Sequence, residues 1–187
     1  MWPKEAITIM KNSKGFSLIE LLAAILILSL VSGGLVTGII LSNNQYKDSI
    51  RQSEASELYN TISSLLTNEL KYTNQVELKA GTNKVEAFKS ISYQIDESNL
   101  CKIYVLYESG FPADGNYGRI AFGDIDNKNY LLGNAAYTND LGAKVNIYYD
   151  DIKKIFTVNL DIGYDDKSII QHPFDVRCLN NVEIIGE

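Results

Sequence analysis

The chain has 187 residues, a formal net charge of −6 and one histidine. The first fifteen residues carry three lysines and one glutamate, so residues 16–187 have a net charge of −8, and such an acidic body argues against nucleic-acid binding. With two cysteines and none of the common zinc or nucleophile motifs, the sequence supports neither an enzyme nor a metal or other cofactor.

The first predicted element is an apolar helix. Residues 21–46 contain no charged side chain, and this run of 26 exceeds the roughly 20 residues that cross a bilayer as a helix. Lysines precede it, which predicts a cytoplasmic N-terminus and export of everything that follows. A cleaved secretory signal peptide and a simple uncleaved anchor are both possible interpretations. Neither explains why Glu20 stands at the start of the apolar run. A carboxylate costs on the order of 2.5 kcal/mol or more at the centre of a membrane helix, so its presence calls for a function.

The segment KGFSLIELL, residues 14–22, resembles the class III signal of type IV prepilins and pseudopilins. The resemblance implies that a prepilin peptidase cuts between Gly15 and Phe16 on the cytoplasmic side and methylates the new amine of Phe16. Glu20 is then the fifth residue of the mature chain, where the family keeps a glutamate that acts in assembly. Gly15 also has a physical reason, since a residue without a side chain lets a peptidase approach the backbone closely.

The resemblance also implies how the chain is organised. Residues 1–15 are a cleaved leader, 16–43 the transmembrane and assembly half of a long helix, 44–75 its amphipathic half, and 76–187 an exported domain. The implied partners are the prepilin peptidase, other pilin subunits contacted through the N-terminal helix, the pilus assembly platform and the membrane. The chain would be a single-pass protein of the cytoplasmic membrane before assembly and part of an extracellular filament afterwards.

Helical patterning continues beyond the apolar run. Residues 47–75 contain no glycine or proline, and their apolar side chains recur at a spacing of three to four: Leu58, Ile62, Leu65, Leu66 and Leu70. This spacing predicts an amphipathic helix whose apolar stripe packs on the exported domain. Within the membrane half, Gly33, Gly34 and Gly38 either loosen the helix in a fibre or allow close contacts between helices.

After residue 80 the pattern changes to short runs rich in tyrosine, isoleucine and valine, separated by turn signals. The predicted strands are residues 90–95, 101–108, 117–123, 129–134, 144–149, 155–162 and 174–179. Their spacing favours an antiparallel meander, and a long N-terminal helix on an antiparallel sheet is an α+β arrangement. This arrangement matches the pilin fold and looks most like that of the larger minor pilins and minor pseudopilins.

The two cysteines of the exported domain form an even pair. Cys101 and Cys178 lie on the side of the membrane where disulfides form. Many pilins pin their C-terminal segment with such a bond, so a Cys101–Cys178 disulfide is a possibility that the resemblance supports. The alternative is two reduced cysteines buried in separate strands.

Other candidate sites are weaker. Asp124, Asp126 and Asn129 offer oxygen ligands for calcium, but Lys128 falls where an EF-hand loop needs Asp or Asn, and acidic turns between strands explain them as well. His172 has no second histidine or catalytic partner, which favours a structural role.

Taken together, the sequence predicts a structural subunit of a type IV pilus-like filament, a minor pilin. One alternative is a pseudopilin of a type II secretion or competence DNA-uptake machine. An alternative from another class is a membrane-anchored surface adhesin that never polymerises. An enzyme has no residues to support it.

Overall fold

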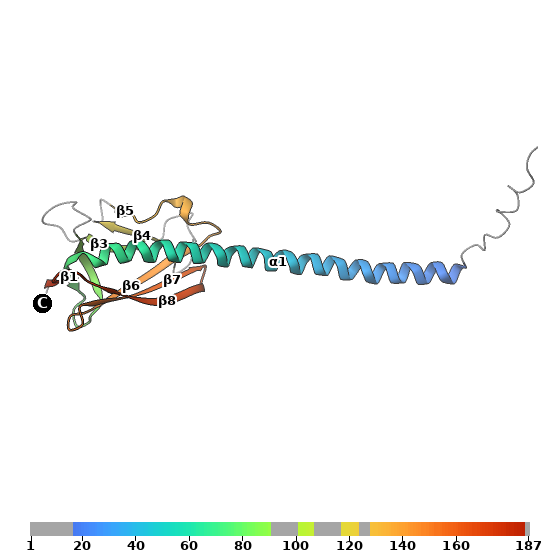
Figure 1. Cartoon of the computed structure of the whole chain (residues 1–187). Helices are drawn as coiled ribbons and strands as arrows, with labels where there is room; N and C mark the ends of the chain where they lie inside the picture. Colours follow the sequence, from blue (N-terminus) through green and yellow to red (C-terminus); the bar gives the residue numbers. More distant parts are fainter. Residues whose placement is uncertain (1–16, 91–100, 107–116, 124–127, 186–187) are drawn as a thin grey trace, which may run out of the picture. The chain divides into compact units, whose positions relative to one another are not determined.

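The computed structural model describes residues 17–90, 101–106, 117–123 and 128–185. The chain divides into two compact units, Met1–Asp48 and Ser49–Glu187. One helix, α1 (Leu18–Lys71), contributes residues to both units (Figure 1). Among the described helices, α1 contains the stretch that is long and apolar enough to cross a membrane, with a mean hydropathy of 2.4.

The second unit contains two β-sheets. The larger sheet has six strands in the order β5-β4-β3-β2-β1-β9, and the smaller has three in the order β6-β7-β8. The strands of the larger sheet are β1 (Thr73–Leu78), β2 (Val85–Ser90), β3 (Cys101–Leu106), β4 (Arg119–Gly123), β5 (Lys128–Tyr130) and β9 (Glu183–Ile185). Those of the smaller sheet are β6 (Gly142–Asp150), β7 (Ile155–Tyr164) and β8 (Lys167–Arg177), and a short 3-10 helix, η3 (Asn134–Ala136), precedes β6. All neighbouring pairs are antiparallel except β1 with β9, which is parallel.

The two sheets meet where the backbones of β4 and β6 approach each other. Gly118 and Ala143 exchange two backbone hydrogen bonds, of 3.0 and 2.8 Å. Gly142 makes this approach possible, because a Cβ at this position would lie 2.9 Å from the Cβ of Tyr117 and 3.0 Å from the backbone nitrogen of Gly118. A second junction joins Tyr149 N–H to the carbonyl of Asn83 at 2.9 Å.

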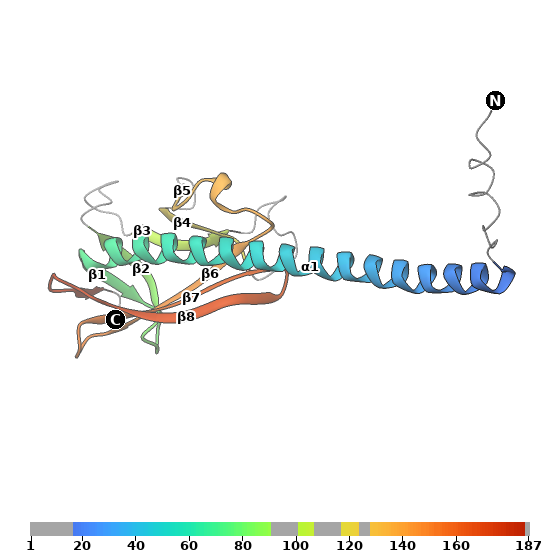
Figure 2. The same ribbon diagram turned by 45° about the vertical axis from the view of Figure 1, so that its right-hand side comes forward.

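The C-terminal part of α1 packs on this sheet core (Figure 2). Its buried residues are Ala55, Leu58, Ile62, Leu66 and Leu70, which follow the spacing of one helix face. Beside this stripe, the ring of Tyr59 lies edge-on to His172 and Phe174, with ring centroids 6.1 and 6.4 Å away. The helix and both sheets therefore enclose one apolar core.

The predicted α+β class is confirmed, with one long N-terminal helix packed against β-sheets. Three details differ from the prediction. The strands form two sheets with one parallel pair, and β1, most of β2 and β9 were not predicted. In addition, α1 ends at Lys71, four residues before the predicted boundary, because the next residues extend into β1. Of the predicted strand at 90–95, only Ser90 is described, at the end of β2.

Candidate functional site: the N-terminal helix

The first turn of α1 is closed by a reciprocal pair of hydrogen bonds. Ser17 Oγ accepts a hydrogen bond from the backbone N–H of Glu20 at 3.3 Å, and Glu20 Oε2 accepts one from the backbone N–H of Ser17 at 2.9 Å. This is a capping box, in which the residue before the helix and the residue three positions later satisfy each other's free N–H groups. Glu20 therefore has a defined role within its own chain, which is to start the helix at Leu18.

The helix that follows presents apolar side chains to its surroundings on every side. Between residues 18 and 41 the large apolar side chains are 53% to 79% exposed. They are Leu18, Ile19, Leu21, Leu22, Ile25, Leu26, Ile27, Leu28, Leu30, Val31, Leu35, Val36, Ile39, Ile40 and Leu41. A helix that is apolar all round needs a lipid or protein environment to cover it, so this segment and its length indicate membrane anchoring.

The polar side chains inside the apolar run are satisfied within the helix. The hydroxyls of Ser29, Ser32 and Thr37 donate hydrogen bonds to the carbonyls four residues earlier, at 2.8, 2.7 and 3.0 Å. Such bonds matter in lipid, where no water is present to replace them. These hydroxyls are therefore compatible with a bilayer and do not require a partner chain.

The three glycines of this segment face open space. A Cβ added at Gly33, Gly34 or Gly38 would have no atom within 4 Å outside its own helical turn. Packing among the described residues of this chain therefore does not require glycine at these positions. Both predicted roles, a looser helix and closer contact with another helix, remain open.

Comparison with known proteins bears on this same segment. Residues 10–36 match the family model of the prokaryotic N-terminal methylation motif. The chain thus carries a class III signal of the type IV prepilin and pseudopilin kind. The match covers Gly15, Phe16 and Glu20, of which Gly15 and Phe16 lie outside the described residues. No curated protein and no solved structure matches the chain significantly.

Cys178 is a free, buried thiol in the structure, and its Sγ donates a hydrogen bond to the carbonyl of Thr73 at 3.0 Å. Cys101 begins β3 opposite Phe88, and β2 lies between β3 and β1. The side chain of Cys101 lies outside the described residues, and the disulfide stays a prediction. Alkylation of freshly exported, unreduced protein tests it, and two free thiols would reject it.

The C-terminal segment is held by hydrogen bonds to the end of α1. The N–H of Leu179 donates to the carbonyl of Lys71 at 2.9 Å, and Asn180 Nδ2 donates to the carbonyl of Tyr72 at 2.9 Å. The last carbonyls of a helix have no partner within it. Residues 178–180 supply these partners, and β9 then adds to the sheet beside β1.

Two further predictions concern the exported domain: the calcium site and the structural role of His172. Asp124 and Asp126 lie outside the described residues, while Asn129 lies exposed in β5. Among the residues that the structure describes, no three His, Cys, Asp or Glu side chains are placed to hold a metal ion. His172 lies in β8 beside Pro173, on the edge strand where proline is tolerated. Its ring packs against Tyr59, whose hydroxyl donates to the carbonyl of His172 at 3.1 Å.

The capping box is the functional feature that sequence reasoning missed. The signal was present, because Ser-x-x-Glu directly before an apolar run is the pattern of this motif. The cost of a carboxylate in the membrane instead favours a role for Glu20 in contacts with other subunits. Both roles involve the same carboxylate, and experiment has to separate them.

Proposed function

We propose that the chain is a structural subunit of a type IV pilus-like filament, present as a minor pilin. Prepilin peptidase removes residues 1–15 and methylates Phe16, and the apolar half of α1 then packs against other subunits. The observation that carries the proposal is the methylation motif at residues 10–36, which overlaps a helix whose apolar side chains are not covered by any of the described residues of this chain. The motif is that of structural proteins, and no enzymatic function is proposed.

Glu20 acts in two stages under this proposal. In the membrane its carboxylate caps the first turn through Ser17. After cleavage, the charged amine of Phe16 becomes a second partner, and Glu20 of one subunit pairs with the Phe16 amine of a neighbour during assembly. Opposite charges attract strongly in low dielectric, while either one alone is heavily penalised. The pair would therefore fix the register between neighbouring helices.

Processing is tested by intact mass and fluorescence. The one tryptophan, Trp2, and both methionines, Met1 and Met10, lie in the predicted leader. A mature chain that begins at Phe16 contains neither residue type. Recovery of Trp2 in the surface-exposed form would contradict the proposed cut. Gly15→Leu should leave the precursor uncut in the membrane.

Three variants separate the two roles of Glu20. Glu20→Gln keeps an acceptor for the Ser17 N–H and removes the charge, Glu20→Val removes both, and Ser17→Ala removes the other half of the capping box. If charge pairing drives assembly, both Glu20 variants are cleaved yet depleted from filaments in competition with the wild type, while Ser17→Ala enters them. If capping alone matters, Glu20→Gln behaves as the wild type and Ser17→Ala is depleted.

The two alternatives differ in what they assemble. A pseudopilin of a type II secretion or DNA-uptake machine is processed in the same way, and a deletion strain loses secretion or transformation. A membrane-anchored adhesin that never polymerises is found only as uncleaved, dispersed monomers. Shearing the cells and analysing the released fraction for cleaved, polymeric chain distinguishes the adhesin from both filament proteins.

A further inference from the structure

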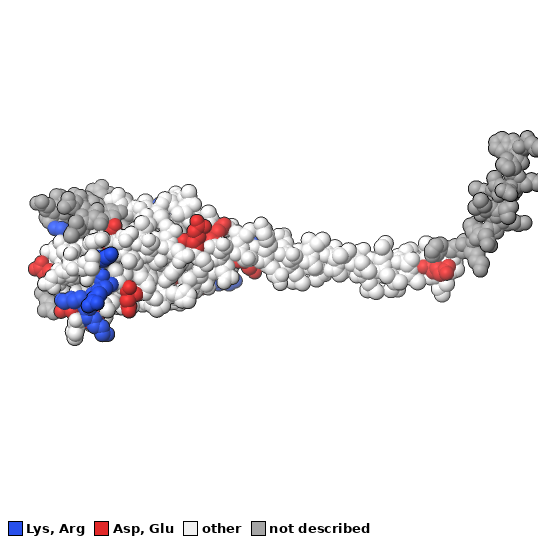
Figure 3. Space-filling model, viewed as in Figure 1, with Lys and Arg blue, Asp and Glu red and all other residues white. Residues whose placement is uncertain are grey.

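Two hairpin tips of the second unit form a basic projection at one end of the domain. The bases of the β1–β2 turn and the β6–β7 turn are joined by the Tyr149–Asn83 hydrogen bond and by pairing of Lys84 with Tyr148. Their tips diverge (Figure 2) around an open hollow that Lys79 and Ile152 help to line. Four lysines against two aspartates give these turns, residues 79–84 and 150–154, a net charge of +2, although the mature chain is strongly acidic. Figure 3 shows Lys and Arg side chains gathered over this end. We call this surface the lysine knob; it consists of Lys79, Lys84, Ile152, Lys153 and Lys154.

The apolar tip of the lysine knob is Ile152, whose side chain is 94% exposed. Its turn is held in one shape, because Asp150 Oδ1 accepts hydrogen bonds from the N–H groups of Ile152 and Lys153 at 3.1 and 3.0 Å. Lys154 pairs with Asp151 at 2.7 Å, which fixes the other side of the turn. A large exposed apolar side chain on an ordered turn loses little conformational entropy on docking.

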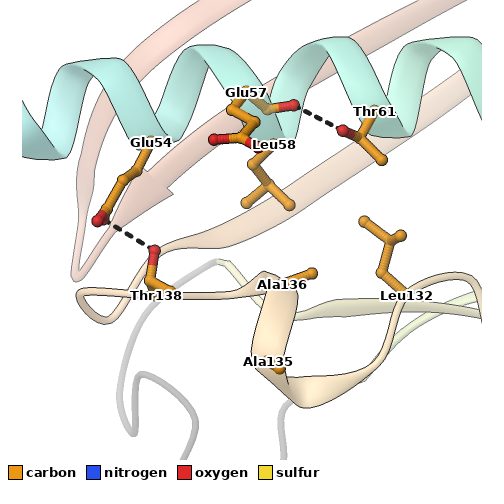
Figure 4. Close-up of a pocket in the computed structure, with 8 residues that line it drawn as sticks. All are labelled: Glu54, Glu57, Leu58, Thr61, Leu132, Ala135, Ala136 and Thr138. Carbon is orange, nitrogen blue, oxygen red and sulfur yellow. Dashed lines mark hydrogen bonds between the residues drawn. The ribbon is translucent and has the colours of Figure 1, made fainter.

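A groove of complementary character lies between α1 and the η3 segment. The pocket has a volume of about 270 Å³ and is lined by Glu54, Glu57, Leu58, Thr61, Leu132, Ala135, Ala136 and Thr138 (Figure 4). We call it the glutamate groove. Leucine and alanine side chains form its apolar part. Glu54 stands at its edge, where it accepts hydrogen bonds from Thr138 Oγ1 at 2.8 Å and from Asn139 Nδ2 at 2.5 Å.

Charge at the groove has the sign opposite to that of the knob. Glu54 and Glu57 line the groove. A third acidic residue, exposed Asp140, follows the lining residue Thr138 by two positions in the chain. The nearest cation on the helix, Arg51, lies over the ring of Tyr164, 4.2 Å from its centroid. Figure 3 shows Asp and Glu side chains gathered over the η3 region, away from the lysines.

The knob and the groove lie at opposite ends of the same strand. Residues 138–141 lead into β6, and Asp150 ends it, so nine strand residues separate the two surfaces. Nine residues at about 3.3 Å each give a separation of about 30 Å. The knob of one chain therefore does not reach the groove of the same chain.

We propose that the lysine knob of one copy docks into the glutamate groove of a second copy, with Ile152 entering the apolar part of the groove. The contact is head-to-tail, and contacts of this kind generate open helical assemblies when the rotation does not close a ring. Complementary charge brings the two surfaces together and selects the register. This inference rests on the proposed filament function and adds the interface between exported domains. The interface requires at least two copies of this subunit to stand next to each other in the filament.

Site-specific cross-linking in cells tests the contact. One tagged copy carries Ile152→Cys and a second, differently tagged copy carries Ala135→Cys, both in a Cys101→Ser, Cys178→Ser background. A short bis-maleimide should join the two tags in the sheared filament fraction. The control partner carries Gln171→Cys, exposed on β8 and outside the groove. We expect the 152–135 product to exceed the 152–171 product at least about fivefold.

Charge reversal supplies an independent measurement in the same cells. Lys79→Glu and Glu57→Lys each change an exposed side chain, so neither should disturb the domain. Each alone should lower the 152–135 product about two- to fivefold, the range expected for an exposed ion pair. When one copy carries the first change and its neighbour carries the second, opposite charges face each other again. Most of the 152–135 product should then be restored.

The outcomes distinguish the interface from the proposed function. The interface is wrong if the 152–135 and 152–171 cross-linked products form in equal amounts. It is also wrong if combining the two charge reversals does not restore the 152–135 product. If the wild-type chain is cleaved and enters filaments while the 152–135 product is absent from both the membrane and the sheared fractions, the interface is wrong and the filament function stands. If the wild-type chain is never cleaved or sheared off, the proposed function itself fails.

Discussion

The two parts of α1 belong to one continuous helix and are stabilised by different means. Residues 49–71 bury five side chains against the sheets, from Ala55 to Leu70, and expose polar residues elsewhere. Residues 18–41 bury none of their large side chains within the described chain, although they are the more apolar part. Helices in globular proteins draw most of their stability from such packing. The first part therefore needs a bilayer or other subunits to cover its apolar side chains, whereas the second part is covered by the sheets of its own domain.

The comparison predicts that equal changes in the two parts have unequal effects. Leu66→Ala should lower the free energy of unfolding of the exported domain by about 2–5 kcal/mol, because Leu66 is fully buried and a cavity remains. Leu26→Ala, at a 61% exposed position, should change it by less than about 0.5 kcal/mol. Urea unfolding of the full chain in detergent, followed by near-ultraviolet circular dichroism of the tyrosines, measures both. Equal losses would contradict the division of the helix.

Glycine substitutions sharpen the same contrast. A Cβ at Gly163 would contact the carbonyl oxygen of Lys167 and lie 2.6 Å from Tyr117 Cζ, so Gly163→Ala should cost about 1–3 kcal/mol of domain stability. Gly34→Ala meets no atom and should leave the domain unchanged while raising the helix propensity of its segment by up to about 1 kcal/mol. Thermal unfolding reports the first effect. Loss of filaments with Gly34→Ala at normal cleavage would show that close helix contacts or local loosening need this glycine.

The smallest expected effect concerns Glu69 in the packed part of the helix. Burial raises the pKa of this carboxyl, and a hydrogen bond with Ser90 lowers it in part. One carboxylate oxygen is buried with no hydrogen-bond partner among the residues that the structure describes. Because the folded-state pKa is raised, the folded state favours the protonated form. Stability is then highest below the ordinary pKa of 4.5 and falls as pH rises through the raised value.

Glu69→Gln should therefore stabilise the domain at pH 7 by less than about 1 kcal/mol and flatten the dependence of stability on pH above 4.5. Unfolding midpoints in urea between pH 4 and pH 8 measure this. Glu57→Gln, on the exposed face of the same helix, controls for the loss of one negative charge. A variant that is less stable than the wild type at pH 7 would contradict the expected sign.

The features that sequence predicted best are those with a local pattern. The spacing of Leu58, Ile62, Leu66 and Leu70 gave the buried face of the helix, and all four are buried. The segment around Gly15 and Glu20 was identified from its motif and lies in the matched region. Leu65 was also placed on the stripe but is only half-buried, because it lies at the edge of the helix face.

The features that sequence did not predict depend on contacts between distant residues. Residues 73–78 continue a helix-like pattern, yet pairing with both β2 and β9 makes them a strand, and tertiary pairing overrides local propensity. The parallel β1–β9 pair brings together segments more than a hundred residues apart. No turn sequence between them indicates that they pair. The same holds for the lysine knob, whose two turns are far apart in sequence and meet through the Tyr149–Asn83 hydrogen bond and the Lys84–Tyr148 bridge.

The junction between α1 and the sheets has a mechanical consequence. Only Tyr72 separates the end of the helix at Lys71 from the start of β1 at Thr73. Tension that the packed helix face from Ala55 to Leu70 does not bear therefore reaches β1 without slack. Hydrogen bonds to β2 on one side and to β9 on the other share this load, and the bond from Leu179 to Lys71 ties the C-terminal segment to the same point. The domain is thus loaded through an internal strand held on both sides, so that several bonds must fail together before the fold yields to a pull.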